Sequence, residues 1–416
     1  MTAPTIRSSI VLLLGLAASG ALAGEKEILF QRITSGLAYG VSDDGTVVVG
    51  GYDSGGGFIW TPQSSTDIGG TAAIAASGDG SLIVGDLLDG SGNSAGRHEA
   101  GDGWIAFGGL GSSGCDSSLS SAYDIASDGQ RCVGLGRDGC SAGAFLWTPN
   151  EGMRALPQLG PNASRADTIS GDGTVIGGWD EASNGGRRAA AWYETPGSAV
   201  WQETLVLEGT PGNSGGFGEV SGSNGDGSIL VGSAQGSSDS TSGAFVLRAD
   251  DGLQLLGLLP SGAPATGGAL DVTEDGRVVV GFQREGFGGA QVFTATYWSA
   301  KTGLVALKDH LNELGADIPA GFTLAAAMSM SDDGRVICGW GYEGLFFFQE
   351  AWVVVLPDGP DACPADFNGD GVVDGADLNT LLGAWGTLAP EFDLTGDGRI
   401  DGADLLELLS AWGPCA

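Results

Sequence analysis

The sequence predicts an all-β protein, a seven-bladed β-propeller of four-stranded blades, followed by a small α-helical domain. Three observations support this prediction. Gly accounts for 77 of the 416 residues, with few Pro and no collagen period, which indicates many tight turns. A short motif recurs seven times between residues 27 and 357. The C-terminal segment then changes to two acidic loops, each followed by an apolar run.

Residues 1–23 have the features of a secretory signal peptide. Arg7 supplies a positive charge, residues 10–16 an apolar core and residues 21–23 (Ala-Leu-Ala) a cleavage site, so Gly24 is the expected mature N-terminus. The apolar run is too short to span a membrane comfortably, and no later stretch approaches the roughly 18 apolar residues that a span needs. We therefore expect a secreted, extracellular protein without a transmembrane segment in the mature chain.

The recurring motif places an Asp-Gly pair between two runs of β-forming residues, as in VSDDGTVVVGG from Val41 and VTEDGRVVVGF from Val272. This pattern predicts a β-hairpin, because the turn needs a positive φ. We interpret the Asp as a structural cap of the turn, with calcium binding there as the alternative. The seven pairs are Asp44-Gly45, Asp79-Gly80, Asp128-Gly129, Asp172-Gly173, Asp226-Gly227, Asp275-Gly276 and Asp333-Gly334.

Two further strands follow the hairpins. The third contains aromatic pairs such as Tyr297-Trp298, which we interpret as core packing, and the fourth begins at Gly, as at Gly252. Four strands per repeat, at intervals of 35 to 58 residues, predict a propeller, with a solenoid as the alternative. The last repeat ends after its third strand, near residues 351–355, so the unassigned strand at residues 27–33 should complete it and close the ring. These repeats, over residues 27–357, resemble the HAF family of bacterial extracellular repeats.

The two acidic loops lie 27 residues apart and have the spacing of calcium-binding loops. Oxygen-bearing side chains stand at positions 1, 3, 5, 9 and 12, with Gly at position 6 and a backbone carbonyl available at position 7. Because Ca²⁺ takes about six to eight oxygen ligands, we expect two bound Ca²⁺ ions. The expected ligands are Asp366, Asn368, Asp370, Val372, Asp374 and Asp377 in the first loop, and Asp393, Thr395, Asp397, Arg399, Asp401 and Asp404 in the second.

An apolar helix is expected after each loop, with Trp385 and Trp412 at matching places. This pair of loop–helix units, over residues 363–416, resembles a type I dockerin. The flanking cysteines, Cys363 and Cys415, make it similar to the cysteine-bracketed variant found at the C-termini of secreted bacterial proteins. The resemblance implies a calcium-folded module that attaches the protein to a cohesin-like or surface-sorting partner. We pair Cys363 with Cys415, since they bracket the module.

The remaining cysteines lie in the repeats. Cys115 and Cys140 flank a predicted hairpin and form the second expected disulfide, which export would permit. Cys132 and Cys338 lie within predicted strands, where we interpret them as small buried hydrophobic residues. The expected organisation is thus a signal peptide (1–23), a propeller (24–357), a linker (358–362) and the dockerin-like domain (363–416).

Charge restricts the class of partner. The chain carries 17 basic and 51 acidic residues, a net charge of −34, which excludes nucleic acids and anionic membranes as favourable partners. Only two histidines are present, His98 and His310, and neither has a metal-binding spacing.

Two functional hypotheses follow. In the first, the protein is non-catalytic: the propeller is a binding or structural module, with a polysaccharide or matrix ligand, and the C-terminal domain attaches it to a surface or scaffold. In the alternative, the protein is a carbohydrate-active enzyme, a polysaccharide hydrolase or lyase with its site on the propeller face. The alternative predicts that carboxylates and aromatic side chains from the irregular regions 86–104, 180–201 and 308–327 converge on one face.

Overall fold

The computed structural model describes most of the chain beyond the N-terminal segment. The described residues are 28–90, 92–111, 119–210, 213–235, 242–261, 263–286, 291–345, 347–357, 365–367, 372–387, 392, 394–395 and 399–414. Among them, no helix is both long enough and apolar enough to cross a membrane.

The Asp-Gly motifs form seven antiparallel hairpins, as the sequence predicted. They join β1 (Leu29–Val41) to β2 (Val48–Tyr52), β5 (Ala72–Ala76) to β6 (Leu82–Leu88), β9 (Ser120–Ile125) to β10 (Cys132–Asp138), β13 (Ser164–Ile169) to β14 (Val175–Glu181), β19 (Gly218–Ser223) to β20 (Ile229–Gln235), β23 (Ala265–Val272) to β24 (Val278–Glu285) and β27 (Phe322–Met330) to β28 (Val336–Glu343).

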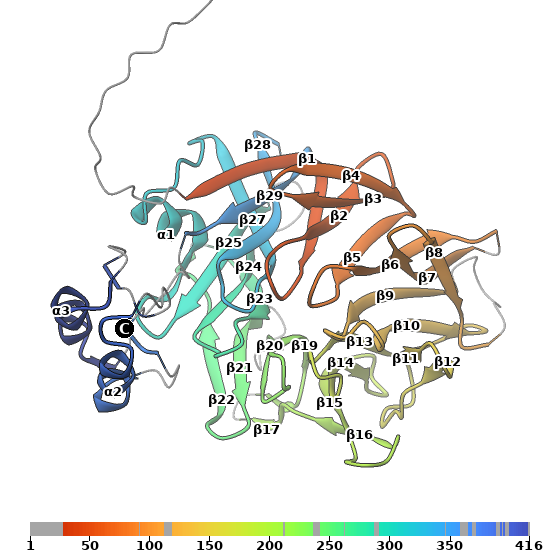
Figure 1. Cartoon of the computed structure of the whole chain (residues 1–416). Coiled ribbons are helices and arrows are strands. Elements are labelled where there is room, and N and C mark those ends of the chain that lie inside the picture. The colour runs from red at the N-terminus through yellow and green to blue at the C-terminus, as the bar shows by residue number, and fades with distance from the viewer. Residues whose placement is uncertain are drawn as a thin grey trace, which may run out of the picture.

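Third and fourth strands extend these hairpins into sheets. They are β3 (Gly57–Thr61), β4 (Ser64–Gly69), β7 (Asn93–Glu99), β8 (Gly103–Gly108), β11 (Ser141–Thr148), β12 (Gly152–Ala155), β15 (Arg187–Glu194), β16 (Trp201–Leu205), β21 (Ser242–Arg248), β22 (Gly252–Gly257), β25 (Val292–Ser299), β26 (Gly303–Ala306) and β29 (Gln349–Val355). Five of the resulting sheets are four-stranded, and a sixth has the order β27-β28-β29-β1-β2-β3-β4. Figure 1 shows the sheets arranged around a common centre, the arrangement of a β-propeller.

The long strand β1 joins the two ends of the propeller. Its first part, Leu29 to Ser35, pairs antiparallel with β29, and its second part, Gly36 to Val41, pairs with β2. The predicted closure by the N-terminal strand is therefore confirmed. The difference from the prediction is that this strand continues without interruption into the first hairpin. Phe30 of the closing segment packs against Phe322 of β27, with ring centroids 5.7 Å apart.

Hydrogen bonds at the Asp-Gly turns support the structural role of the Asp. At the first turn, the Asp44 carboxylate accepts from the Ser42 hydroxyl and from the Thr46 backbone N–H, at 2.7 and 2.9 Å. The Asp333 carboxylate accepts equivalent bonds from Ser331 and Arg335. The Gly of every pair has a φ between 66° and 75°, which residues with a Cβ rarely adopt. The turn Asp thus satisfies backbone donors that would otherwise lack partners.

Side chains between neighbouring sheets form the core. The third-strand aromatic residues Phe58, Phe145, Trp192, Phe245 and Tyr297 are all fully buried. Their burial confirms that these residues pack the sheets together instead of forming an exposed platform.

Three elements of the propeller region were not expected from the repeat. A short hairpin of β17 (Glu208–Thr210) and β18 (Asn213–Gly215) follows the fourth strand β16. Helix α1 (Leu307–Glu313) follows β26, and its Leu307 and Leu311 are buried in the core next to β25 and β27. His310 lies on this helix, stacked on Tyr297 at 4.3 Å between ring centroids.

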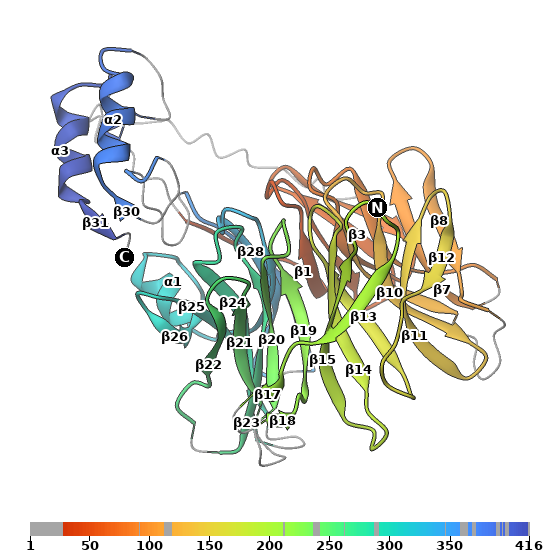
Figure 2. The same ribbon diagram turned by 90° about the horizontal axis from the view of Figure 1, so that it is seen from below.

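The C-terminal segment contains two helices outside the sheets (Figure 2), α2 (Gly375–Gly383) and α3 (Gly402–Ser410). Two-residue strands, β30 (Val372–Val373) and β31 (Gly413–Pro414), pair antiparallel and join the start of α2 to the end of α3. The small core between the helices contains Val373, Leu381, Ile400 and Leu408, all fully buried.

Candidate functional sites

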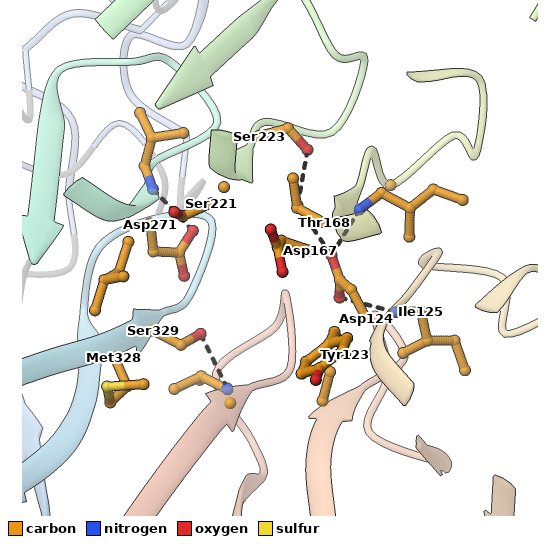
Figure 3. A pocket seen from close by; sticks show the side chains of 18 of the residues that line it. Tyr123, Asp124, Ile125, Asp167, Thr168, Ser221, Ser223, Asp271, Met328 and Ser329 are labelled. Atoms are coloured by element: carbon orange, nitrogen blue, oxygen red, sulfur yellow. Dashed lines mark hydrogen bonds between the residues drawn. The ribbon is translucent and has the colours of Figure 1, made fainter. Parts of the chain in front are cut away.

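A cavity of about 380 Å³ lies at the centre of the propeller. Its wall is built by the first strand of every repeat, namely β1, β5, β9, β13, β19, β23 and β27. Because these strands are far apart in the sequence, their convergence on one cavity follows only from closure of the ring. Figure 3 shows side chains from several of them pointing into the same space.

Each of the seven inner strands carries a β-bulge at the same place. The extra residue lies five positions before the Asp of the Asp-Gly pair, and in every repeat it lines the cavity. We call these residues the bulge ring. A bulge re-aims a side chain out of the regular alternation of a strand, which explains why these side chains reach the cavity. They are Tyr39, Ile74, Tyr123, Asp167, Ser221, Leu270 and Met328.

Asp167 is the acidic member of the bulge ring. Its Oδ1 lies 2.5 Å from Arg165 Nε, and its Oδ2 is buried without a hydrogen-bond partner among the described residues. The Arg165 guanidinium is shared, since it also lies 3.6 Å from the Glu219 carboxylate and over the ring of Tyr123 at 5.0 Å. Burial raises the pKa of Asp167 to about 8, although the nearby Arg165 acts in the opposite direction.

The residue after the bulge connects neighbouring sheets in several repeats. The Asp124 carboxylate accepts from Ile169 N–H and the Thr168 hydroxyl of the next sheet, at 2.8 and 3.0 Å. The Asp271 carboxylate accepts from Met330 N–H of the next sheet at 2.8 Å. The Ser329 hydroxyl accepts from Val41 N–H at 3.2 Å. Burial raises the pKa of Asp124 to about 7 and that of Asp271 to about 6.

The residues that precede the turn Asp form a hydrogen-bonded ring at the Asp-Gly end of the cavity. For example, the backbone N–H of Ser127 donates to Gly171 O at 3.0 Å, and that of Asp332 donates to Asp43 O at 3.1 Å. Three of these residues, Glu274, Asp332 and Asp43, come from consecutive repeats and are acidic. Burial, together with Asp43 and Glu274, raises the pKa of Asp332 to about 7. One end of the cavity therefore brings three acidic side chains together.

Each of the two C-terminal loops is a further candidate site, built around the carboxylate at its position 12. Asp377 and Asp404 are both fully buried. Asp377 accepts from the backbone N–H groups of Phe367 and Asp374, at 2.8 and 2.9 Å. Asp404 accepts from those of Thr395 and Asp401, at 3.1 and 2.7 Å. Each carboxylate therefore holds the beginning and the end of its own loop together.

The position-9 residues cap the two C-terminal helices. Asp374 and Asp401 are the N-caps of α2 and α3, and each accepts from the N–H two residues further along. With the residue at position 12, each completes a capping box. This reciprocal bonding explains why Asp stands at both places in both loops.

The other expected ligands lie in three settings. Val372 lies in β30 and Arg399 directly precedes the buried Ile400. Asp366 is almost completely buried, with 1 % of its side chain exposed, and it accepts from Arg277 of the propeller at 2.9 Å. Asn368, Asp370, Asp393 and Asp397 lie outside the described residues. Within the part of the chain that is described, no three His, Cys, Asp or Glu side chains are grouped as metal ligands.

The cysteines divide into bonded and free residues. Cys140 is disulfide-bonded, and its expected partner Cys115 lies outside the described residues, as do Cys363 and Cys415. Cys132 and Cys338 are free and fully buried, as predicted, and burial raises the pKa of both thiols far above its ordinary value.

The irregular regions named by the enzyme hypothesis do not meet at the cavity. Of the described residues that line it, none comes from 86–104, 180–201 or 308–327. The repeats themselves form the site, and sequence reasoning missed it. The signal that could have found it is the position five residues before each turn Asp, which is apolar, aromatic or small except at Asp167.

No family model matches the chain, and no curated protein matches it. Solved structures of similar fold include TolB from Acinetobacter baumannii (10 % identity, TM-score 0.41), where the similarity covers 66 % of this chain and 63 % of that one. The β-propeller domain of the Trilobed protease from Pyrococcus furiosus is 8 % identical, with a TM-score of 0.47 over 78 % of this chain and 96 % of that one.

Oligogalacturonate lyase from Vibrio parahaemolyticus is 10 % identical, with a TM-score of 0.46 over 80 % of this chain and 97 % of that one. All three TM-scores are low, so the fold is assigned here from the sheets, the closing strand and the central cavity.

Proposed function

We propose that this protein is an exported, non-catalytic binding protein that its C-terminal domain attaches to a partner in a calcium-dependent way. The observation that carries this proposal is the twofold repetition of the C-terminal domain. Two loops with calcium-ligand spacing end in the equivalent buried carboxylates Asp377 and Asp404, and each leads into a capped helix. We propose that each loop binds one Ca²⁺ ion.

Calcium would complete the loops through the carboxylates described above. Buried carboxylates gathered at the start of a helix are costly unless cations or hydrogen bonds compensate their charge. The ion would supply that compensation, and its binding free energy would add to the stability of a domain with a small core.

An exposed apolar surface at the C-terminal ends of the two helices and just beyond them supports attachment to a partner. Leu382 and Trp385 follow the first loop, and Leu409 and Trp412 occupy the equivalent positions 27 residues later. All four side chains are between 44 % and 50 % exposed. Repeated, exposed tryptophans are typical of protein-binding surfaces. Together with the resemblance to dockerins, they support a cohesin-like or surface-sorting partner.

We infer that the propeller has seven blades, because the seven-stranded sheet comprises two four-stranded sets that share β1.

We propose the central cavity as the binding site of the propeller. A concave site with a few polar groups among apolar ones is the usual form of a ligand pocket. The signal peptide expected at residues 1–23 places this binding activity outside the cell.

Calcium titration of the mature chain, residues 24–416, by calorimetry tests the proposal. We expect two bound ions per chain, and fewer after Asp377→Asn or Asp404→Asn. Asp275→Asn, at an Asp-Gly turn, is the matched control and should leave the stoichiometry at two. Absence of binding at millimolar calcium would contradict the proposal, and loss of binding in the control would move the calcium sites to the propeller.

A further inference from the structure

The chemistry of the bulge ring indicates which ligand the cavity can accept, and this step rests on the propeller being a binding module. Six members of the ring are uncharged, and Asp167 stands among them as a single carboxylate. A bulge has placed this carboxylate in the cavity, although the side chain is only 10 % exposed. Figure 3 shows it near the middle of the cavity.

One oxygen of Asp167 is left without a partner in the part of the chain that the structure describes. Arg165 engages Oδ1, while Oδ2 is buried and accepts no hydrogen bond. Buried polar atoms normally have a partner, so an orphan acceptor on a side chain that lines a cavity indicates a donor supplied by a ligand. This observation is independent of the overall acidity of the wall.

The wall of the cavity contains more acidic than basic side chains, which favours a cationic ligand. Its described residues include six carboxylates and one guanidinium, that of Arg165. Arg165 is already shared between Asp167 and Glu219, at 2.5 and 3.6 Å. Asp332 and Asp43 extend the acidic surface to the Asp-Gly end of the cavity. An entering cation would meet acidic side chains there and at the bulge ring and would favour their ionised forms, whereas an anion would disfavour them.

Organic cations fit the wall better than metal ions do. The carboxylates belong to different repeats, and no group of three acidic side chains among the described residues converges as metal ligands. Tyr39, Tyr123, Leu270 and Met328 add aromatic and apolar surface to the wall of the same cavity. Such surface suits an alkyl chain, and an aromatic face attracts an ammonium group.

We propose that the central cavity binds an organic primary ammonium group, which donates to Oδ2 of Asp167 while its alkyl chain lies against the bulge ring. The ammonium group can belong to a small free amine or to a lysine side chain of a partner. In either case Asp167 is the residue that selects a cationic ligand over an uncharged one.

Calorimetry on the mature chain, with calcium present, tests this proposal with four probes. 1,4-Diaminobutane represents a free amine and N-acetyl-lysine amide a protein side chain. Their uncharged counterparts are 1,4-butanediol and N-acetyl-norleucine amide. We expect at least one amine to bind, and its counterpart to bind at least tenfold more weakly. Preference for the diamine assigns a free amine, and preference for the lysine derivative assigns a protein side chain.

Two variants test whether the amine contacts Asp167. Asp167→Asn should weaken amine binding at least tenfold, because an amide cannot ionise beside the ammonium group and changes the shape of the side chain little. Glu151→Gln makes the same acid-to-amide change at an exposed carboxylate outside the cavity wall and should have no effect. The comparison of amines with uncharged probes needs no variant, so the proposal can be tested even if Asp167→Asn does not fold.

Three results would overturn the proposal: no amine binding, equal binding of the uncharged probes, or unchanged binding by Asp167→Asn. One more titration distinguishes failure of the amine proposal from failure of the proposed binding function. Ile74→Trp would narrow the cavity. If a neutral oligosaccharide such as cellohexaose binds to the wild type and this variant loses that binding, the propeller remains a binding module of another specificity. Calcium titration of the same sample reports on the C-terminal domain independently.

Discussion

At the scale of single residues, the wall of the cavity shows how burial changes acid–base behaviour. Asp124 holds two neighbouring sheets together through Ile169 and Thr168, and burial raises its pKa to about 7. The folded protein therefore binds this proton more tightly than the unfolded chain, in which an Asp titrates at about 3.9. The contribution of Asp124 to stability is complete below about pH 4 and is lost as the pH rises through 7.

We predict that Asp124→Asn reduces the loss of stability between pH 5 and pH 8.5. The free energy of unfolding, measured with urea at several pH values, should fall with pH in the wild type and fall less steeply in the variant. Asp79→Asn is the control, because hydrogen bonds from Ser81 and Ser77 lower the pKa of Asp79 and keep it ionised throughout this range. Equal slopes for wild type and Asp124→Asn would show that Asp124 does not titrate in this window.

At the scale of elements, strand β1 keeps the ring closed. Its N-terminal half covers the edge of β29, whose backbone groups would otherwise be open to pairing with another chain. Adjacent residues of this half have different environments. Phe30 packs against Phe322 and the core cluster beneath it, while Leu29 is 42 % exposed.

We predict that Phe30→Ala lowers the free energy of unfolding by about 2 kcal/mol, because it leaves a void at the closing strand. Leu29→Ala, one residue earlier on the same strand, should change it by less than about 1 kcal/mol. Chemical denaturation with an intrinsic fluorescence signal measures both. If the two variants were equally stable, packing of the closing strand would not contribute to ring closure.

At the scale of the whole molecule, an ion pair connects the propeller to the first C-terminal loop. Arg277 follows the sixth Asp-Gly turn, and it contacts Asp366, the expected first ligand of the first calcium loop. A guanidinium beside a ligand carboxylate opposes the approach of Ca²⁺ through charge repulsion. By thermodynamic reciprocity, calcium in this loop should weaken the contact between the loop and the propeller.

We predict that Arg277→Ala tightens calcium binding at one of the two sites by roughly fivefold, equivalent to about 1 kcal/mol. Gln130→Ala, at the same place in another Asp-Gly turn, should leave both affinities unchanged. Calorimetric titration of the two variants and the wild type makes the comparison. Weaker binding in Arg277→Ala would mean that the arginine organises the loop for calcium and does not compete with the ion.

Local patterns in the sequence determined much of this protein. The Asp-Gly pairs, the alternation of β-forming residues and the unassigned N-terminal strand predicted the hairpins and the closure of the ring, because turns and strand pairing within a repeat depend on neighbouring residues. The buried carboxylates Asp377 and Asp404 belong to loops that a fixed ligand spacing had already marked. The helices after these loops were predicted from the apolar residues that follow each loop.

Only the tertiary structure decided what the propeller presents at its centre. Asp167, Tyr123 and Arg165 come from different strands or from positions whose direction depends on a bulge, and a bulge cannot be located from alternation alone. The contact between Arg277 and Asp366 joins residues 89 positions apart. Such contacts depend on how seven repeats close into one ring, and ring closure brings together side chains that no local pattern connects.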